Sequence, residues 1–211
     1  MLNTILHHVY GLFNPKVFEN EAASYYAGSH NSQSLRKIFA LMNKTGESNF
    51  FSPIPITFRG VAPLTELKLV TKQLGKPLAE SSKRYLKKTL KTLTYNHEID
   101  GIETDTIINF LDNKAISFTY HINTLSKGAA IKIKQHICNR YGINDASTVS
   151  SFCLIDEFNN KLLFTFEFDL VIHYVTADEE MLDQVAKILN EVEIHKQYIT
   201  RSHQNQTELA F

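Results

Sequence analysis

The sequence predicts an α+β fold, in which helices cover one face of an antiparallel sheet made of two hairpin-type units. Two regions of strict period-2 alternation, 90–122 and 162–174, supply the strands. Three segments with apolar residues at helical spacing, 64–74, 126–141 and 177–195, supply the helices. Helices on one side of a sheet bury its apolar face and leave the other face free. The order helix, hairpin, helix, hairpin also indicates a doubled α-β-β unit.

Length and composition describe an ordinary folded chain with no overall charge. The 211 residues are 43% hydrophobic and 21% charged, and the formal net charge is zero. Such a balance gives no general attraction to nucleic acid or to a membrane surface. No stretch reaches the ~18 consecutive apolar residues of a membrane helix, and the N-terminus lacks the basic start and cleavage site of a signal peptide. We therefore expect a cytoplasmic protein without a membrane span.

Cysteine usage and short motifs indicate no metal and no cofactor. Cys138 and Cys153 are the only cysteines, and both lie in apolar runs. Two cysteines are too few for a disulfide framework or a zinc site, so we expect buried, reduced thiols. The chain also lacks a glycine-rich phosphate loop, a G-x-S-x-G elbow, an H-E-x-x-H pair and a C-x-x-C pair.

We expect three regions along the chain. An N-terminal helical region with an extended segment, 1–60, packs on the core; the main α+β domain is 61–199; and a polar C-terminal tail is 200–211. Within the first region, helical spacing is visible up to about residue 44. Three prolines limit 49–63 to an extended segment or an edge strand.

The first group of strands has two predicted turns. Asp100-Gly101 is a strong two-residue hairpin signal, which pairs Ile99 with Ile102. The next loop must have an odd length if Phe110 and Ile116 are to share the buried side. A three-residue loop over 112–114 satisfies that condition.

The second group ends in one long strand. Seven apolar residues occupy every second position over 162–174, so we expect a single strand of about 15 residues with a bend or bulge near Asp169. A capping box at Thr176-Ala177-Asp178-Glu179 then opens the last helix. Glu167, Asp169 and His173 would share one face of the long strand, where they form a weak cation candidate or, more simply, part of a polar sheet face.

The predicted register brings polar residues of three strands into one row. Asn96 faces Asp105 and Asp105 faces His121, with Glu98 and Glu103 paired beside them. An aspartate next to a histidine can orient the ring and raise its pKa, as in a general base or half of a metal site. The alternative is a solvated sheet face with an exposed ion pair worth about 0–1 kcal/mol.

Positive charge is concentrated in one part of the chain. Between residues 68 and 91, eight lysines and arginines accompany a single acidic residue. Lys68, Lys72 and Lys76 recur at every fourth position and form a stripe on the predicted helix 64–74. Such a stripe could contact phosphates or an acidic protein surface, or simply be solvated. Few aromatic residues lie between the basic ones, which ranks protein contact above nucleic acid.

Three functional hypotheses follow. The first is a non-catalytic cytoplasmic binding or adaptor protein, which contacts a protein partner through Asn96 and the exposed sheet face or through the basic stripe. The second, which leaves open whether the protein is an enzyme, is a small hydrolytic or metal-assisted enzyme. The third is a nucleic-acid-associated factor. The enzyme would use Asp105 and His121 with Glu98 or Glu103, and the nucleic-acid factor would use Lys68, Lys72, Lys76, Lys87 and Lys88. Nothing in the sequence indicates an oligomeric state.

Overall fold

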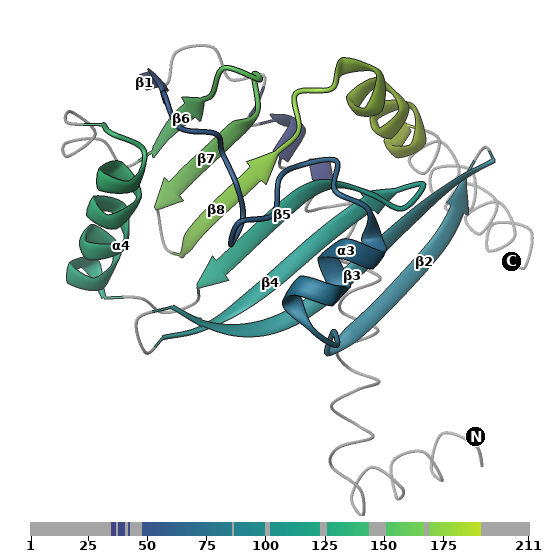
Figure 1. Ribbon diagram of the computed structural model, residues 1–211, viewed down its shortest axis with the longest axis horizontal. Coiled ribbons are helices and arrows are strands. Elements are labelled where there is room, and N and C mark those ends of the chain that lie inside the picture. The colour runs from purple at the N-terminus through teal and green to yellow at the C-terminus, as the bar shows by residue number, and fades with distance from the viewer. Residues whose placement is uncertain are drawn as a thin grey trace, which may run out of the picture.

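The computed structural model describes residues 35, 36, 38–40, 42, 48–85, 87–99, 102–122, 126–143, 151–166 and 169–190 (Figure 1). The described strands form one sheet in the order β1-β6-β7-β8-β5-β4-β3-β2. They are β1 (Ser48–Phe51), β2 (Ala79–Tyr85), β3 (Lys88–Ile99), β4 (Ile102–Leu111), β5 (Lys114–Ile122), β6 (Ser151–Ile155), β7 (Lys161–Phe166) and β8 (Leu170–Val175). The helices are α3 (Leu67–Leu74) and α4 (Lys127–Arg140), with further helical residues at 179–190 and within 35–42.

The sheet corrects the predicted fold class. It is one mixed sheet, not two antiparallel hairpin units or a doubled α-β-β unit. β5 pairs with β8 and joins the two groups of strands, and β1 adds a parallel pair with β6 at one edge. The other neighbouring pairs are antiparallel. The parallel pair joins Phe50 to Leu154, more than a hundred residues apart. Local periodicity carries no information about such distant partners.

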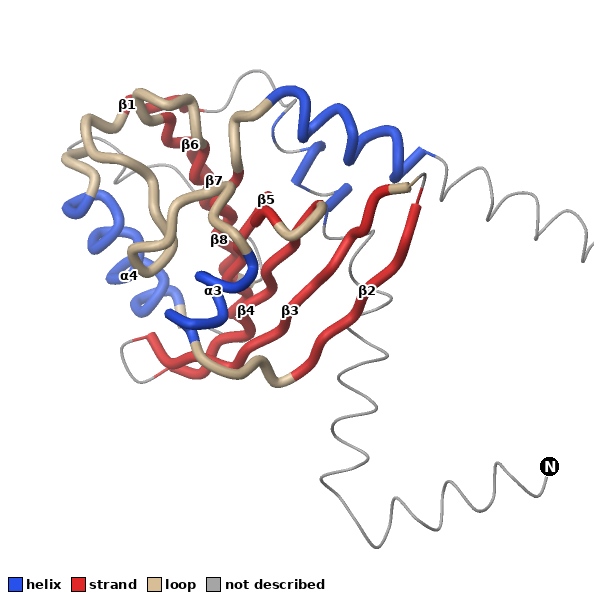
Figure 2. Tube along the Cα trace, turned by 45° about the vertical axis from the view of Figure 1, so that its right-hand side comes forward, coloured by secondary structure: helices blue, strands red, loops and turns tan. Residues whose placement is uncertain are grey.

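Helices lie on both faces of the sheet, which also differs from the prediction. We call the face that carries Phe118 and Tyr120 the front face; α3 and α4 cover it. The rear face carries Leu163 and Val175, and residues 179–190 and the described residues within 35–42 cover it (Figure 2). An apolar stripe shows that a helix buries one side, but not which face of the sheet it meets. Both faces of the central strands are therefore buried.

The predicted long strand is a hairpin. β7 ends at Phe166, β8 begins at Leu170, and these two residues pair with each other. The connection has three residues, so the apolar residues before and after it fall on the same face. Because the alternation keeps its phase across the turn, the pattern alone could not reveal it.

Several predictions concern parts of the chain that lie outside the described residues. These are the helices before residue 35, the polar tail 200–211, and Glu167 of the weak cation candidate. In the part of the chain that the structure does describe, no helix is both long and apolar enough to cross a membrane.

Candidate functional site

The predicted polar row is confirmed in its register. Asn96 pairs with Asp105, Glu98 pairs with Glu103, and Asp105 pairs with His121. Asn96 and Asp105 are exposed, and so are Glu98 and Glu103.

The structure reaches this register by a different route from the one predicted. The turn after β4 has two residues, with Leu111 paired to Lys114, and a β-bulge opposite the step Asn109–Phe110 adds one residue to β5. Ile116 consequently packs on the rear face and not beside Phe110. The prediction that Phe110 and Ile116 lie on the same side of the sheet was wrong. The pairing of Asp105 with His121 is nevertheless correct, because the extra residue in β5 compensates for a loop one residue shorter than predicted.

The polar row is exposed to solvent, and the ion pair that His121 forms there is weak. His121 Nε2 lies 3.5 Å from Asp169 Oδ2, and the two side chains are 37% and 42% exposed. Ion pairs this exposed contribute about 0–1 kcal/mol. Among the described residues, no group of three histidine, cysteine or acidic side chains could hold a metal ion. The arrangement brings the predicted residues together without the enclosure that water-sensitive chemistry needs.

Other histidines serve the packing. His173 is buried, and its Nδ1 lies 2.9 Å from Thr119 Oγ1. His97 is half-buried on the front face, where its ring stacks on Tyr95 and its Nδ1 lies 3.0 Å from Thr106 Oγ1. Burial, reinforced by the nearby Arg59 guanidinium, lowers the pKa of His97 below its usual value.

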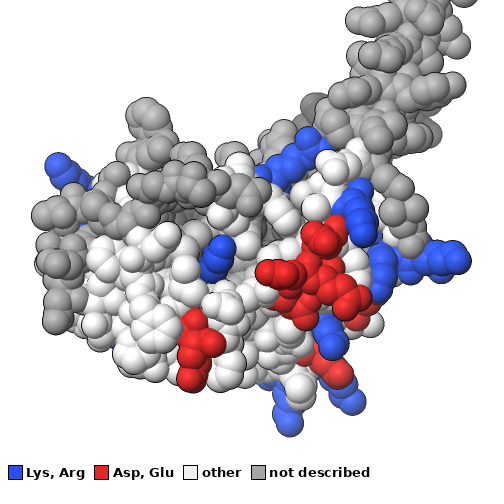
Figure 3. All heavy atoms as spheres, turned by 90° about the horizontal axis from the view of Figure 1, so that it is seen from above, with Lys and Arg blue, Asp and Glu red and all other residues white. Residues whose placement is uncertain are grey.

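Part of the predicted basic region is neutralised in the fold. Lys88 Nζ lies 2.7 Å from Asp112 Oδ2, and Lys91 Nζ lies 2.7 Å from Glu80 Oε1. Seen from above, acidic and basic side chains lie side by side on the surface (Figure 3). The charge segregation along the sequence therefore does not become a single basic surface.

The lysine stripe is divided by the end of α3. Lys68 and Lys72 are exposed on the helix, whereas Lys76 follows Gly75, whose φ of 86° ends the helix. Val70 on the opposite side is fully buried in the front core. The helix thus presents two of the three predicted lysines on one outward side.

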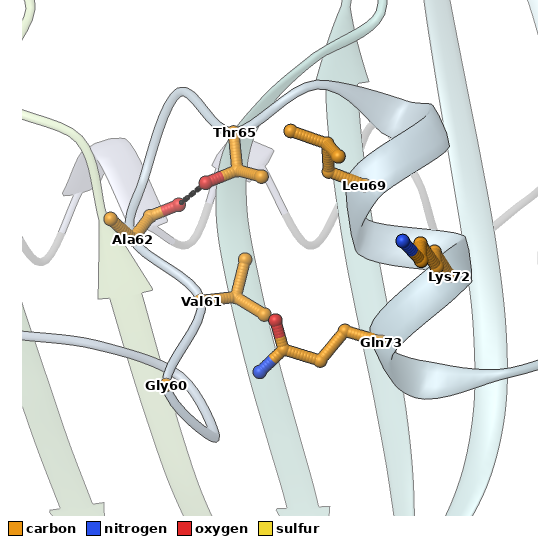
Figure 4. A pocket seen from close by; sticks show the side chains of 7 residues that line it. All are labelled: Gly60, Val61, Ala62, Thr65, Leu69, Lys72 and Gln73. Carbon is orange, nitrogen blue, oxygen red and sulfur yellow. Dashed lines mark hydrogen bonds between the residues drawn. The ribbon is translucent and has the colours of Figure 1, made fainter.

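An open hollow of about 500 Å³ lies between α3 and the segment that precedes it (Figure 4). Leu69 and Lys72 line it from the helix, and Leu69 is 55% exposed. The complete lining is Gly60, Val61, Ala62, Thr65, Leu69, Lys72 and Gln73. An ammonium group beside an exposed leucine suits a ligand that carries both an anionic and an apolar group.

The wall opposite α3 is a tight turn that was not predicted from the sequence. Phe58 and Val61 exchange two backbone hydrogen bonds of 2.8 Å, and the residues between them, Arg59 and Gly60, have φ of 48° and 81°. Two positive φ values are typical of a type I′ turn. Arg-Gly is not one of the usual sequences for this turn, so Gly60 was the only available signal.

The turn is fixed to the core and to the helix. Phe58 is fully buried; its ring stacks on Phe118 at 4.9 Å and contacts Tyr120 in a tilted arrangement at 4.7 Å between ring centroids. Gln73 Nε2 donates a 2.8 Å hydrogen bond to the Arg59 carbonyl. Both walls of the hollow are therefore held in place without a ligand.

Arginines flank the aromatic floor below this turn. Burial raises the pKa of Tyr120, and the guanidinium groups of Arg59 and Arg140 oppose that rise. Arg140 also donates a 3.1 Å hydrogen bond to Thr57 Oγ1 and lies over the Tyr141 ring. These contacts add positive charge beside the segment that carries the turn.

Comparisons of the chain with protein-family models, curated proteins and solved structures found no match. The functional argument therefore rests on the residues and geometry of the chain itself.

Proposed function

We propose that this protein is a non-catalytic binding or adaptor protein that holds a protein partner at the hollow beside α3. The observation that supports this most directly is the hollow itself, which places Lys72 and the exposed Leu69 against a preformed turn. Lys68 lies one helical turn away on the same exposed side. The partner segment would carry an acidic group for the lysines and an apolar side chain for Leu69.

Preorganisation favours binding at this place. Association loses free energy when loops and side chains must become ordered, and a rigid site avoids part of that loss. Phe58 anchors one wall in the core, and the Gln73 hydrogen bond joins that wall to α3. An acidic partner would also be attracted by the Lys72 ammonium group, since no carboxylate among the described residues lies within ion-pair distance of it.

A reducing compartment agrees with this proposal. Cys138 and Cys153 are both buried, and neither forms a disulfide. Free thiols are usual where disulfides do not persist, as in the cytoplasm. We therefore keep the cytoplasm as the proposed location.

A small hydrolytic or metal-assisted enzyme is the second candidate. One observation favours it, the alignment of Asp105 with His121 across β4 and β5. The row ranks below the hollow because Asp105 is exposed and the ion pair of His121 with Asp169 is long and partly exposed. Exposure to solvent weakens both a general base and a metal site.

The proposal is tested by capturing partners from native cells with the tagged protein, after nuclease treatment. Reversing charge in the pair Lys68→Glu and Lys72→Glu should abolish capture of a stoichiometric protein. The matched control is Lys127→Glu with Lys132→Glu, which changes the same charge on exposed positions of α4. Capture that survives the α3 reversal, or an eluate without a partner, contradicts the proposal.

A further inference from the structure

Strand β2 is the last strand of the described sheet and pairs with β3 on one side only. It forms a border of the sheet in Figure 1. An edge strand offers a row of backbone donors and acceptors to any strand that can approach it. Charged side chains commonly prevent such pairing, and Lys83 and Arg84 are exposed on β2. The order of charges therefore decides which strands the edge excludes and which it accepts.

The charges of β2 are arranged so that the strand complements itself. In an antiparallel pair of two β2 strands centred on Ser82, Glu80 of each copy lies opposite Arg84 of the other. Ser81 then lies opposite Lys83, so no like charges are directly opposed. Directly opposed side chains interact most strongly, and opposite charges there are favourable.

Neighbouring registers lack this complementarity. A pair centred on Lys83 places the two copies of that lysine directly opposite each other. A pair centred on Ser81 places Glu80 opposite Ser82 and leaves Arg84 opposite Leu78. One register is therefore selected by charge.

The side chains that would meet are available for contact. The Glu80 side chain is 50% exposed, and Arg84 is exposed. Glu80 pairs with Leu93 of β3 in register, which places Glu80 and Arg84 on the front side of the strand. Lys91 Nζ, 2.7 Å from Glu80 Oε1, holds the carboxylate on that side.

We infer that β2 is a homotypic interface, through which two copies of this chain pair antiparallel around Ser82. The sheet then continues from one copy into the other, and a two-fold axis perpendicular to the sheet passes between the two copies of Ser82. Residues directly opposite each other in such a pair share a face. The front faces of both copies are thus on the same side, and so are both helices α3 with their hollows.

The first test measures the oligomeric state of the full chain by sedimentation velocity over a range of concentrations. The wild-type protein should be a dimer. Arg84→Glu should raise the dimer dissociation constant at least about tenfold, because a carboxylate at position 84 then lies opposite Glu80, and the two-fold symmetry produces this repulsion twice. Adding Glu80→Arg to that variant should restore dimerisation. Lys83→Glu, on the opposite face of β2, should change it little. A wild-type monomer, or a dimer indifferent to Arg84→Glu, overturns the inference.

The second test reads the register by disulfide formation. Ser82→Cys should form a covalent dimer under mild oxidation, because the two copies of this position are opposed across the axis. Lys83→Cys is the matched control, since its own copy lies on the diagonal, about 7–8 Å away. Cys138 and Cys153 are buried and provide a low background. Equal cross-linking at positions 82 and 83, or none at 82, excludes the proposed pairing.

Discussion

At the scale of single residues, Asp156 joins two segments that are far apart in the sequence. The residue is 1% exposed, and its carboxylate accepts hydrogen bonds from the backbone of Ile56, at 2.8 Å, and from the turn between β6 and β7. The turn donors are Phe158 N at 2.9 Å, Asn160 N at 2.8 Å and Asn160 Nδ2 at 3.2 Å. Four donors to one carboxylate explain how a charged group can be buried here.

We expect Asp156→Ala to lower the free energy of unfolding by about 2–3 kcal/mol, because it leaves buried donors without an acceptor. Urea unfolding followed by circular dichroism measures the change. Glu157→Ala is the control, since this neighbour is exposed. An effect of Asp156→Ala no larger than that of the control would show that water replaces the carboxylate.

His97 makes stability depend on pH. Its pKa is lowered in the folded state, from an ordinary value of 6.5, mainly by burial and then by the charge of Arg59. The unfolded chain therefore binds a proton more readily. The contribution of His97 to stability is fully present above pH 6.5 and is lost as the pH falls through the lowered pKa.

We expect His97→Gln to reduce the loss of unfolding free energy between neutral and mildly acidic pH. Glutamine retains a hydrogen-bonding group near Thr106 but does not titrate. Urea midpoints at several pH values measure the effect, with His136→Gln on the exposed side of α4 as the control. If the wild-type and His97→Gln profiles run parallel, another group causes the pH dependence.

At the scale of elements, a tight turn shapes the candidate binding site as much as the helix beside it does. The turn at Arg59 and Gly60 builds one wall of the hollow, and its geometry needs a residue with positive φ at position 60. A Cβ there would also lie 3.3 Å from Gln73 Nε2. Gly128 in α4 has neither constraint, because nothing lies within 4 Å of an added Cβ.

We expect Gly60→Ala to destabilise the protein by about 1–2 kcal/mol, since a Cβ disfavours the left-handed conformation. Gly128→Ala should instead be neutral or stabilising by up to about 1 kcal/mol, because alanine favours the helix. Thermal unfolding of the two variants side by side checks the opposite signs. A Gly60→Ala protein as stable as wild type would mean that the turn adopts another type.

The helices themselves were largely predictable. The stretch 64–74 contains α3, 126–141 contains α4, and the apolar stripe beginning at Met181 is buried, although on the rear face and not on the face that the sequence predicted. One detail differs at the start of that last helix. Asp178 Oδ1 accepts from Met181 N at 2.9 Å, so Asp178 caps it, whereas Thr176 Oγ1 accepts from Asp178 N. Two capping residues two positions apart both satisfy the sequence pattern, and only the backbone path selects one.

At the scale of the whole molecule, the two cores show why the predicted one-sided sheet was wrong. Helices α3 and α4 bury the front face, and residues 179–190 with the described residues within 35–42 bury the rear face. The rear face also contains a chain of buried side-chain hydrogen bonds. Thr92 donates to Asn109 at 2.8 Å, and Asn109 donates to Ser117 at 3.0 Å. Such residues look solvent-facing in sequence, but here they satisfy one another in a buried layer.

The proposed surfaces also belong to the whole molecule. The hollow uses residues 60–65 and 69–73, and neither part predicts the other from its own pattern. The β2 edge exists only because β2 ends the strand order. A β2-paired dimer would carry two hollows on one face, so a partner with two acidic segments would bind more tightly than one with a single segment.

The sequence by itself determined the β3–β4 hairpin register, which pairs Asn96 with Asp105, and the positions of the three main helices. Short-range alternation and helical spacing suffice there, because the interacting residues are neighbours along the chain. The sequence placed His121 opposite Asp105 only because the unpredicted bulge in β5 offset the error in the predicted loop length. Only the tertiary structure decided that β5 pairs with β8, that β1 lies parallel to β6, and which face each helix covers. These choices depend on contacts between distant segments, whose free energies no local pattern records.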